Sequence, residues 1–136
     1  MVTDLKVACV QTSSSTSVAA NIRASSKMIR EAAAKGASLI TLPEVVNICQ
    51  RRGTLAKAAA RLEQEDPSLA AYRALSKELG VWILIGSLAL RLGDDERLGN
   101  RSFLISSDGK VVARYDKIHM FDVNLADGST FRESET

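Results

Sequence analysis

Two charged residues, each placed where an apolar segment ends, suggest the chemistry of this chain. Glu44 closes the segment SLITLPE (residues 38–44), and Lys117 follows a second strand-like segment, residues 110–115. A carboxylate can take a proton from a nucleophile, and a lysine can stabilise a developing oxyanion. Strand ends would hold both groups in the fixed geometry that proximity catalysis needs. The pair is therefore typical of a hydrolase that cleaves amides through a covalent intermediate.

The nucleophile of such a mechanism is the part that the sequence lacks. Cys9 lies in the middle of an apolar segment, where we expect a small buried residue. Cys49 lies on a loop shortly after Glu44, but only Arg51 and Arg52 nearby could stabilise its thiolate. No cysteine follows Cys49. We therefore predict that these 136 residues contain no nucleophile and are inactive alone.

Apolar segments alternate with amphipathic ones along the first two thirds of the chain. Residues 5–11 are nearly all apolar, as in a strand buried on both faces, and residues 37–42 form a second strand. Helical spacing over residues 18–35 lies between them, which favours a crossover with parallel strands. A short alanine-rich helix is expected over residues 55–64.

The next elements have clear boundaries. Asp66 and Pro67 start a helix that Gly80 ends, with Tyr72 on its inner face. Trp82 opens a third strand and is also expected in the core. The turn at residues 107–109 predicts a hairpin of strands 101–106 and 110–115, whereas residues 118–136 show no strong periodicity.

This order of elements predicts an α/β fold with helices on one side of a sheet. The opposite face of so apolar a sheet needs a cover that this chain does not supply. We expect one domain, because 136 residues leave no room for two.

Composition excludes several classes of protein. The net charge of +2, with basic residues spread among acids, gives no footprint for nucleic acid. The longest apolar run, residues 81–85, is too short for a membrane span, and the first six residues do not resemble a secretory leader. Two cysteines and one histidine suit a reducing cytosol and no structural zinc site. We therefore expect a cytoplasmic protein without metal, cofactor or membrane partner.

Two short motifs carry no function in this interpretation. The segment IGSL (residues 85–88) lacks the second glycine of a serine nucleophile elbow. The segment NRS (residues 100–102) matches a glycosylation sequon, which has no meaning without a secretory route. The sequence also contains no phosphate-binding loop and no dinucleotide fingerprint.

Segments spread over nearly the whole chain resemble the nitrilase superfamily of carbon–nitrogen hydrolases. They are KVACVQ (6–11), GASLITLPE (36–44), the segment 79–87, YDKIH (115–119) and FRES (131–134). The resemblance implies an α-β-β-α sandwich and a Glu-Lys-Cys triad. It makes Glu44 the general base, Lys117 the group that stabilises the tetrahedral intermediates, and Glu133 a second glutamate that assists catalysis. His119 would be an orienting or packing residue near the site.

The family places its cysteine after the second glutamate, on the next strand, and this chain ends three residues after Glu133 (136 − 133). The resemblance thus implies that residues 1–136 are the N-terminal portion of a carbon–nitrogen hydrolase domain, truncated before the nucleophile strand. Family members usually associate through a contact between sandwiches, so a homo-oligomer is expected.

The segment HMFD (residues 119–122) indicates which branch of the superfamily the chain resembles. It is similar to the His-Leu-Phe-Asp run of ω-amidases and deaminated glutathione amidases, whereas members acting on carbamoylated amines more often show His-Ile-Pro. The substrate implied is a small ω-amide of a keto acid or peptide-like acid, cleaved through a thioester with release of ammonia. The alternatives are a non-catalytic half-domain that binds a partner through its uncovered sheet, and a half complemented by a separately made C-terminal half.

Overall fold

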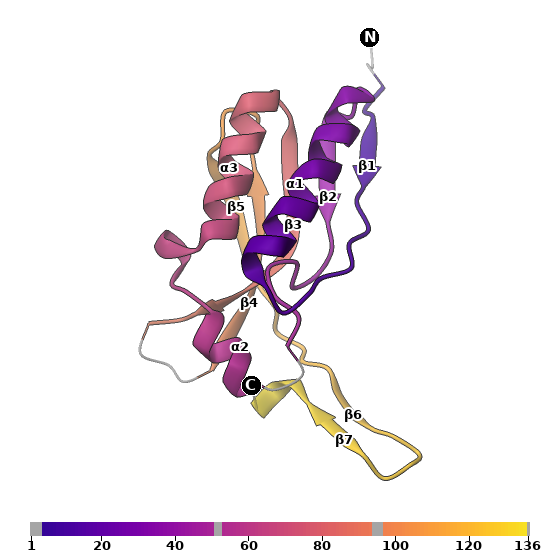
Figure 1. Cartoon of the computed structure of the whole chain (residues 1–136), viewed down its shortest axis with the longest axis vertical. Coiled ribbons are helices and arrows are strands. Elements are labelled where there is room, and N and C mark those ends of the chain that lie inside the picture. Colours follow the sequence, from indigo (N-terminus) through magenta and orange to yellow (C-terminus); the bar gives the residue numbers. More distant parts are fainter. Residues whose placement is uncertain (1–3, 51–52, 94–96, 136) are drawn as a thin grey trace.

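The computed structural model describes residues 4–50, 53–93 and 97–135. Predictions that involve residues 1–3, Arg51, Arg52 or Thr136 lie outside these described residues. The described part forms one five-stranded sheet, two long helices packed on one face of it, and a two-stranded hairpin that projects from one end (Figure 1). None of the described helices is long and apolar enough to cross a membrane.

The helices and strands follow one another as predicted for the first hundred residues. The strands are β1 (Val7–Cys9), β2 (Leu39–Leu42), β3 (Trp82–Arg91), β4 (Leu98–Ile105), β5 (Val111–Asp116), β6 (Asp122–Asn124) and β7 (Thr130–Arg132). The helices are α1 (Val18–Ala34), α2 (Gly53–Ala59) and α3 (Pro67–Leu79), with single 3₁₀ turns η1 (Glu63–Glu65) and η2 (Glu133–Glu135). The helix expected over residues 55–64 is therefore shorter than predicted and is followed by a separate turn.

The sheet has the order β1-β2-β3-β4-β5. Strands β1, β2 and β3 are parallel, which confirms the predicted crossover, and β3, β4 and β5 are antiparallel, which confirms the predicted hairpin. The two parallel pairs bring the carboxyl end of β2 beside the middle of β3, where Leu42 pairs with Ile85. Glu44 therefore leaves the sheet next to its central strand.

Capping residues fix both long helices. Ser17 caps α1, and its hydroxyl accepts a hydrogen bond from the backbone N–H of Ala20. Asp66 caps α3 through a 2.8 Å hydrogen bond from the N–H of Leu69, with Pro67 in the first helical turn. Gly80 ends α3 with a left-handed φ of 67°. Both predicted boundaries of this helix are confirmed.

The core lies between the two helices and the sheet. Ile29 of α1, Tyr72 of α3 and Phe103 of β4 are fully buried there, together with Ile40 and Ile83 of the central strands. The prediction that Tyr72 is a core residue is confirmed.

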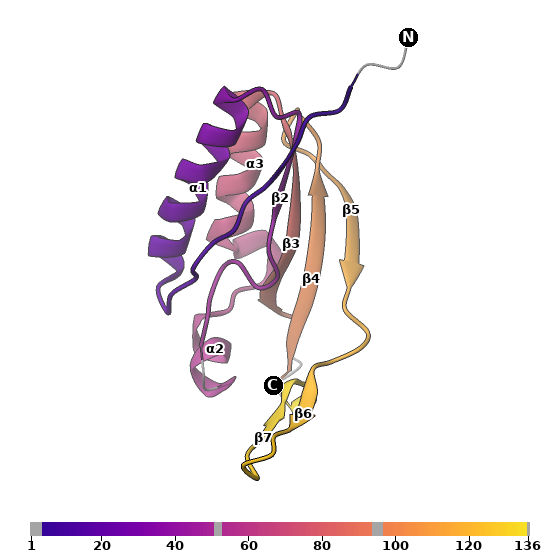
Figure 2. The same cartoon turned by 90° about the vertical axis from the view of Figure 1, so that its right-hand side faces the viewer.

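None of the helices in the described part of the chain lies on the opposite face of the sheet (Figure 2). Trp82 and Leu84 point to this face, and 38% and 37% of their surfaces are exposed. The prediction that Trp82 belongs to the core is therefore wrong. Val7 and Cys9 are exposed as well, so the predicted burial of the first strand on both faces and of Cys9 is also wrong. The physical reason is the same in each case, because these side chains lie on a layer that only one side covers.

Residues 122–132 form a hairpin that the sequence did not suggest. Strands β6 and β7 pair antiparallel around a turn at Asp127 and Gly128, where Gly128 has a φ of 85°. The rings of Phe121 and Phe131 lie 6.0 Å apart at the base of this hairpin. This contact and the short ladder return the chain toward the sheet, so that Glu133 faces the residues around Lys117.

Candidate active site

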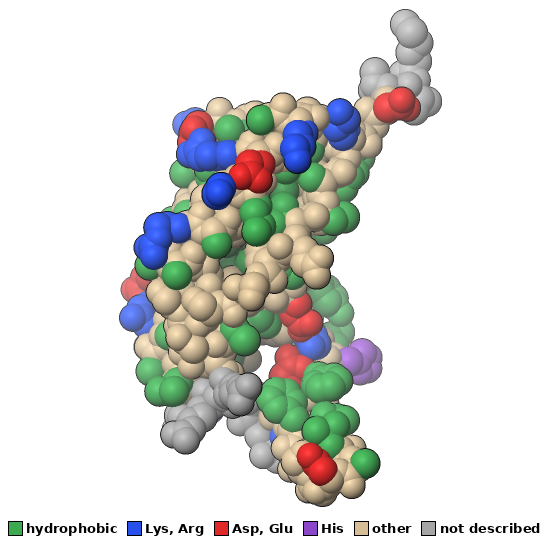
Figure 3. Space-filling model, turned by 45° about the vertical axis from the view of Figure 1, so that its right-hand side comes forward, with side chains coloured by type: hydrophobic (Ala, Val, Ile, Leu, Met, Phe, Trp, Pro, Cys, Tyr) green, Lys and Arg blue, Asp and Glu red, His purple; other side chains and the backbone are tan. Residues whose placement is uncertain are grey.

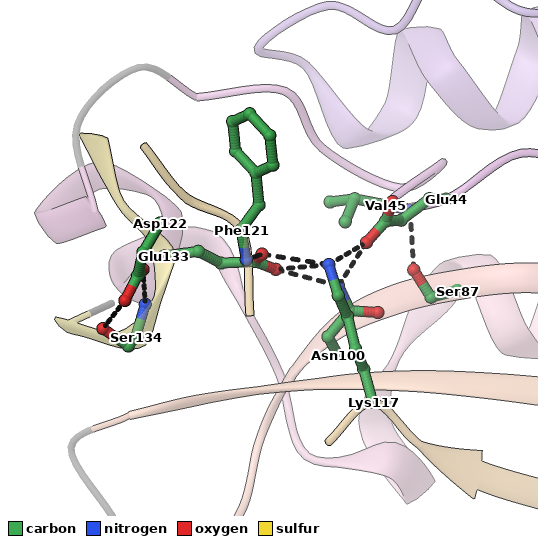
Figure 4. A network of polar contacts seen from close by, with 9 residues as sticks. All are labelled: Glu44, Val45, Ser87, Asn100, Lys117, Phe121, Asp122, Glu133 and Ser134. Carbon is green, nitrogen blue, oxygen red and sulfur yellow. Dashed lines mark hydrogen bonds and ion pairs between the residues drawn. The ribbon is translucent and has the colours of Figure 1, made fainter. Parts of the chain in front are cut away.

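Lys117 lies between two carboxylates that come from distant parts of the chain. Its ammonium donates to Glu44 Oε1 at 2.8 Å, and to Glu133 Oε2 and Oε1 at 2.9 and 3.2 Å. Figure 4 shows the three side chains converging on one point. The structure thus brings together all three residues that the sequence analysis selected, although they lie up to eighty-nine positions apart (133 − 44).

Each of the three side chains is placed by a different element. Glu44 follows β2 directly after Pro43, and Lys117 follows β5, where its N–H donates to the carbonyl of Asn100 at 2.9 Å. Glu133 follows β7 and begins the turn η2. Its backbone N–H donates to the carbonyl of Phe121 at 3.2 Å, which ties it to the segment that leads into β6.

Asn100 is a site residue that the sequence analysis did not select. Its side-chain Nδ2 donates to Glu44 Oε1 at 2.9 Å and to Glu133 Oε1 at 3.2 Å. The amide therefore joins the same two carboxylates as Lys117, but without a charge. In the sequence, Asn100 is recognisable only as part of a glycosylation sequon, because its position opposite Lys117 depends on a register shift between β4 and β5.

Hydrogen bonds and charge keep both carboxylates ionised. The hydrogen bond from Lys117 and then that from Asn100 lower the pKa of Glu44. Burial acts to raise the pKa of Glu133, but the Phe121 N–H, Lys117 and Asn100 outweigh it, so this pKa is lowered too. The hydrogen bond to Glu44, reinforced by Glu133, raises the pKa of Lys117. At neutral pH the cluster therefore holds two negative charges and one positive charge.

The cluster lies in a recess between the body of the molecule and the β6–β7 hairpin. Figure 3 shows acidic and basic side chains meeting there, with hydrophobic side chains on the adjacent hairpin. The Glu44 side chain is 57% exposed, whereas those of Lys117 and Glu133 are largely covered. Glu44 is thus the member of the cluster that an incoming group can reach most directly.

An apolar cavity of about 190 Å³ adjoins the cluster. Asn100 and Glu133 form its polar wall, and Ile48, Leu98 and Phe131 are among its apolar lining. Such a mixture, with few polar groups on an otherwise apolar wall, is typical of a small-molecule site.

The remaining candidates lie outside the cluster. His119 is exposed, and its side chain has no hydrogen-bond partner among the described residues. Cys49 is exposed and is held by its backbone N–H, which donates to the carbonyl of Ser15 at 3.0 Å. Neither cysteine contacts Glu44, Lys117 or Glu133 through any hydrogen bond of the described residues. Within the described ranges, no group of three His, Cys, Asp or Glu side chains is arranged to hold a metal ion.

Comparison with known proteins relates this arrangement to one enzyme family. The family model described as carbon-nitrogen hydrolase matches residues 6–136. An ω-amidase of Arabidopsis thaliana chloroplasts is 38% identical over 119 residues, which are 85% of this chain and 32% of that protein. A deaminated glutathione amidase of Synechocystis is 31% identical over 134 residues, which are 95% of this chain and 47% of that protein.

The fold comparison agrees with these sequence matches. The crystal structure of the C. elegans NitFhit protein superposes with a TM-score of 0.81 and 27% identity, covering 95% of this chain and 31% of that chain. The chain thus spans less than half the length of each of these relatives.

Proposed function

Because this chain belongs to the carbon-nitrogen hydrolase family, we propose that the complete protein is an amidase that hydrolyses a non-peptide C–N bond. The observation that carries the proposal is the position of Lys117 between Glu44 and Glu133, within 3.2 Å of both. This geometry supports the proposal, because a proton acceptor and an oxyanion partner would then lie side by side.

In the proposed reaction, Glu44 takes the proton of a cysteine thiol supplied by sequence beyond these 136 residues. The thiolate attacks the amide carbon, and the developing oxyanion is stabilised by the ammonium of Lys117. The proton held by Glu44 passes to the amide nitrogen and the C–N bond breaks, so that ammonia leaves and the acyl group remains bound to sulfur as a thioester. Water, deprotonated by Glu44, then attacks the thioester carbon, which restores the thiol and releases a carboxylate.

Glu133 has an orienting role in this proposal. Its two oxygens accept from Lys117 and its Oε2 also accepts from the Phe121 N–H at 2.5 Å. Because these bonds use both oxygens, Glu133 is poorly placed to accept a further proton. Glu133 holds the Lys117 ammonium beside Glu44, and its carboxylate adds a second negative charge to the cluster.

The substrate class is proposed to be a small ω-amide of a carboxylic acid. Two relatives of this chain are named ω-amidase and deaminated glutathione amidase, which supports this class. The cavity of about 190 Å³ beside Asn100 and Glu133 supports a small substrate, because a cavity of roughly 150 Å³ already holds a molecule the size of benzene.

Substitution of Glu44 by glutamine in the complete protein tests the proposal. The amide side chain keeps the shape of Glu44 but cannot take the thiol proton, so ammonia release from ω-amides should fall by at least 100-fold, in line with the loss of a general base. The matched control is Glu78→Gln, because Glu78 also pairs with a cation, Arg30, but lies on α3 away from the cluster. Unchanged turnover in the Glu44→Gln protein would refute the proposed role.

The second candidate is a non-catalytic module that binds a partner through the uncovered face of the sheet. The exposure of Trp82 and Leu84 on that face favours it. The two proposals differ in one measurement. The amidase releases ammonia from an ω-amide and loses this activity with Glu44→Gln, whereas the binding module releases none.

A further inference from the structure

The backbone just after Glu44 adopts a conformation that its residue type disfavours. Val45 has a φ of 46°, and it is the one described non-glycine residue with a positive φ. A β-branched side chain in this left-handed region is strained, because its Cβ approaches the neighbouring carbonyl oxygen. Such a conformation persists only where surrounding contacts hold it.

The contacts that hold it come from an irregularity in the central strand. Strand β3 pairs with β4 through Ile85–Phe103 and then through Leu88–Arg101, so that two residues of β3 lie opposite one residue of β4. This is a β-bulge, a feature that often redirects side chains next to functional sites. The two residues of the bulge are Gly86 and Ser87.

Ser87 is buried and makes three hydrogen bonds that bracket Glu44 along the chain. Its N–H donates to the carbonyl of Pro43 at 3.3 Å, and its carbonyl accepts from the N–H of Val46 at 3.1 Å. Between these, its side-chain Oγ accepts from the N–H of Val45 at 2.8 Å, a bond that Figure 4 shows beside Glu44. Only this last bond comes from the side chain.

Gly86 allows the bulge to come this close. A Cβ at this position would lie 2.5 Å from the carbonyl oxygen of Leu42 and 2.6 Å from the carbonyl carbon of Pro43. The carbonyl of Gly86 is itself held from β4 by the hydroxyl of Ser102 at 2.5 Å. The turn after β2 therefore rests directly on the bulge, with no side chain between the two backbones.

We propose that Ser87 is a positioning residue: its hydroxyl holds the Val45 turn in the left-handed conformation and thereby aims the Glu44 carboxylate at Lys117. Ser87 contacts neither Lys117 nor Glu133 through any hydrogen bond of the described residues. It acts only through the backbone of the residue that follows Glu44. The family relationship and the segment IGSL do not by themselves assign this role.

The positioning role of Ser87 rests on the proposed amidase function only where it predicts a change in kcat. The positioning of Glu44 is measurable without turnover, because the lowered pKa of Glu44 depends first on its hydrogen bond from Lys117 and then on that from Asn100. If the Val45 turn relaxes, Glu44 leaves both partners and its pKa returns toward the ordinary value of 4.5.

The test uses Ser87→Ala in the complete protein, with two readouts. Carbon-13 NMR titration should show the pKa of Glu44 rising toward its ordinary value. The kcat for ω-amide hydrolysis should fall roughly 10- to 100-fold with little change in KM, because small misplacements of a catalytic group have effects of this size. Ser76→Ala is the matched control, because Ser76 is equally buried and its hydroxyl donates to two carbonyls far from the cluster. It should leave the pKa of Glu44 unchanged.

Val45→Gly separates positioning from general support of the fold. Glycine adopts a positive φ without strain, so the turn should no longer need the Ser87 hydroxyl. Ser87→Ala should then cost less than threefold in kcat when introduced into the Val45→Gly protein, in place of the larger loss in the parent. An equal loss in both backgrounds would overturn the proposal, and so would an unmoved Glu44 pKa in Ser87→Ala. If the pKa moves but Glu44→Gln leaves turnover intact, the proposed function fails and the positioning role stands.

Discussion

Replacing Asn100 by aspartate should convert two attractive contacts of the candidate site, those from Asn100 to Glu44 and to Glu133, into repulsive ones. The substitution keeps the shape of the side chain and exchanges its NH₂ group for a charged oxygen. That group lies 2.9 Å from Glu44 Oε1 and 3.2 Å from Glu133 Oε1. The cluster would then hold three carboxylates around the single ammonium of Lys117.

The size of the effect follows from the distances and the exposure. Two like charges about 4 Å apart repel by about 1 kcal/mol when water screens them, and the 57% exposure of Glu44 makes this screened value the appropriate one. Two such contacts give about 2 kcal/mol, and the loss of two hydrogen bonds adds roughly 1 kcal/mol each. These contributions add to about 4 kcal/mol, but Glu44 can turn toward solvent and weaken the repulsion, so we expect a loss of about 2 kcal/mol at pH 7.

The way in which the stability of Asn100→Asp changes with pH shows whether charge repulsion causes the loss of stability. Repulsion from the introduced aspartate opposes the hydrogen bonds that lower the pKa of Glu44 and Glu133 in the parent, so both pKa values should rise in the variant. A raised carboxyl pKa destabilises the folded state above the ordinary value of 4.5, and this effect disappears as the carboxyls become protonated at lower pH. Asn100→Asp should therefore be clearly less stable than the parent at pH 7, and this difference should shrink as the pH falls toward about 3.

Denaturant unfolding at the two pH values, with carbon-13 titration of both glutamates, measures these quantities. Asn124→Asp is the control, because it makes the same substitution beside Arg132, whose guanidinium already donates to the Asn124 side chain at 2.7 Å. This control should be neutral or slightly stabilising. If Asn100→Asp unfolds like the parent at pH 7, or leaves both glutamate pKa values unmoved, the assigned role of Asn100 in the cluster is refuted.

Two further predictions concern the cluster and the core. The lowered pKa values of Glu44 and Glu133 mean that the cluster stabilises the fold above about pH 4.5 and loses this contribution as pH falls through the lowered values, while the raised pKa of Lys117 preserves it through mildly alkaline pH. The protection factor of the Phe121 amide against hydrogen exchange should fall accordingly in acid, because this amide donates to Glu133 Oε2, and a protection factor independent of the cluster's titration would contradict this. Tyr72→Phe should cost about 1 kcal/mol of unfolding free energy, because it removes the 2.8 Å hydrogen bond between Tyr72 and Ser25. A double-mutant cycle that combines Tyr72→Phe with Ser25→Ala should show that most of this loss in unfolding free energy comes from the interaction between the two side chains.

Local signals in the sequence predicted most of the sheet and helices correctly. The ends of α3 follow from Asp66, Pro67 and Gly80, whose preferences act within one turn of the chain. The α/β fold and the resemblance to carbon–nitrogen hydrolases are both confirmed. The absence of a nucleophile, the cytoplasmic location and the homo-oligomer remain predictions.

Burial was harder to predict because it depends on which layers cover a strand. Cys9 and Trp82 have residue types that are commonly buried, and both were expected in the core. The structure places them on the face without helices, where they are exposed. Residue type alone does not distinguish the two faces of an apolar sheet.

Asn100 escaped prediction for a geometric reason. Counting back from the hairpin turn pairs residues of β4 and β5 in regular order, but the ladder shifts by one residue between Leu104 and Ile105. This shift brings the carbonyl of Asn100 to the N–H of Lys117. A bulge of this kind depends on long-range packing, and so does the left-handed conformation of Val45. Neither has a local signature strong enough to reveal it.

The uncovered face and the candidate site are connected by the pleat of β4. Alternate residues of a strand point to the same face, so Asn100 shares its face with Leu104, opposite to buried Phe103. Leu104 in turn pairs with Leu84, which is exposed on the face that carries no helix. Asn100, which joins the two glutamates of the cluster, thus lies on the same side of β4 as the exposed apolar side chains. Water excluded from the cluster would strengthen every electrostatic interaction within it, because charges interact more strongly in a medium of lower dielectric constant.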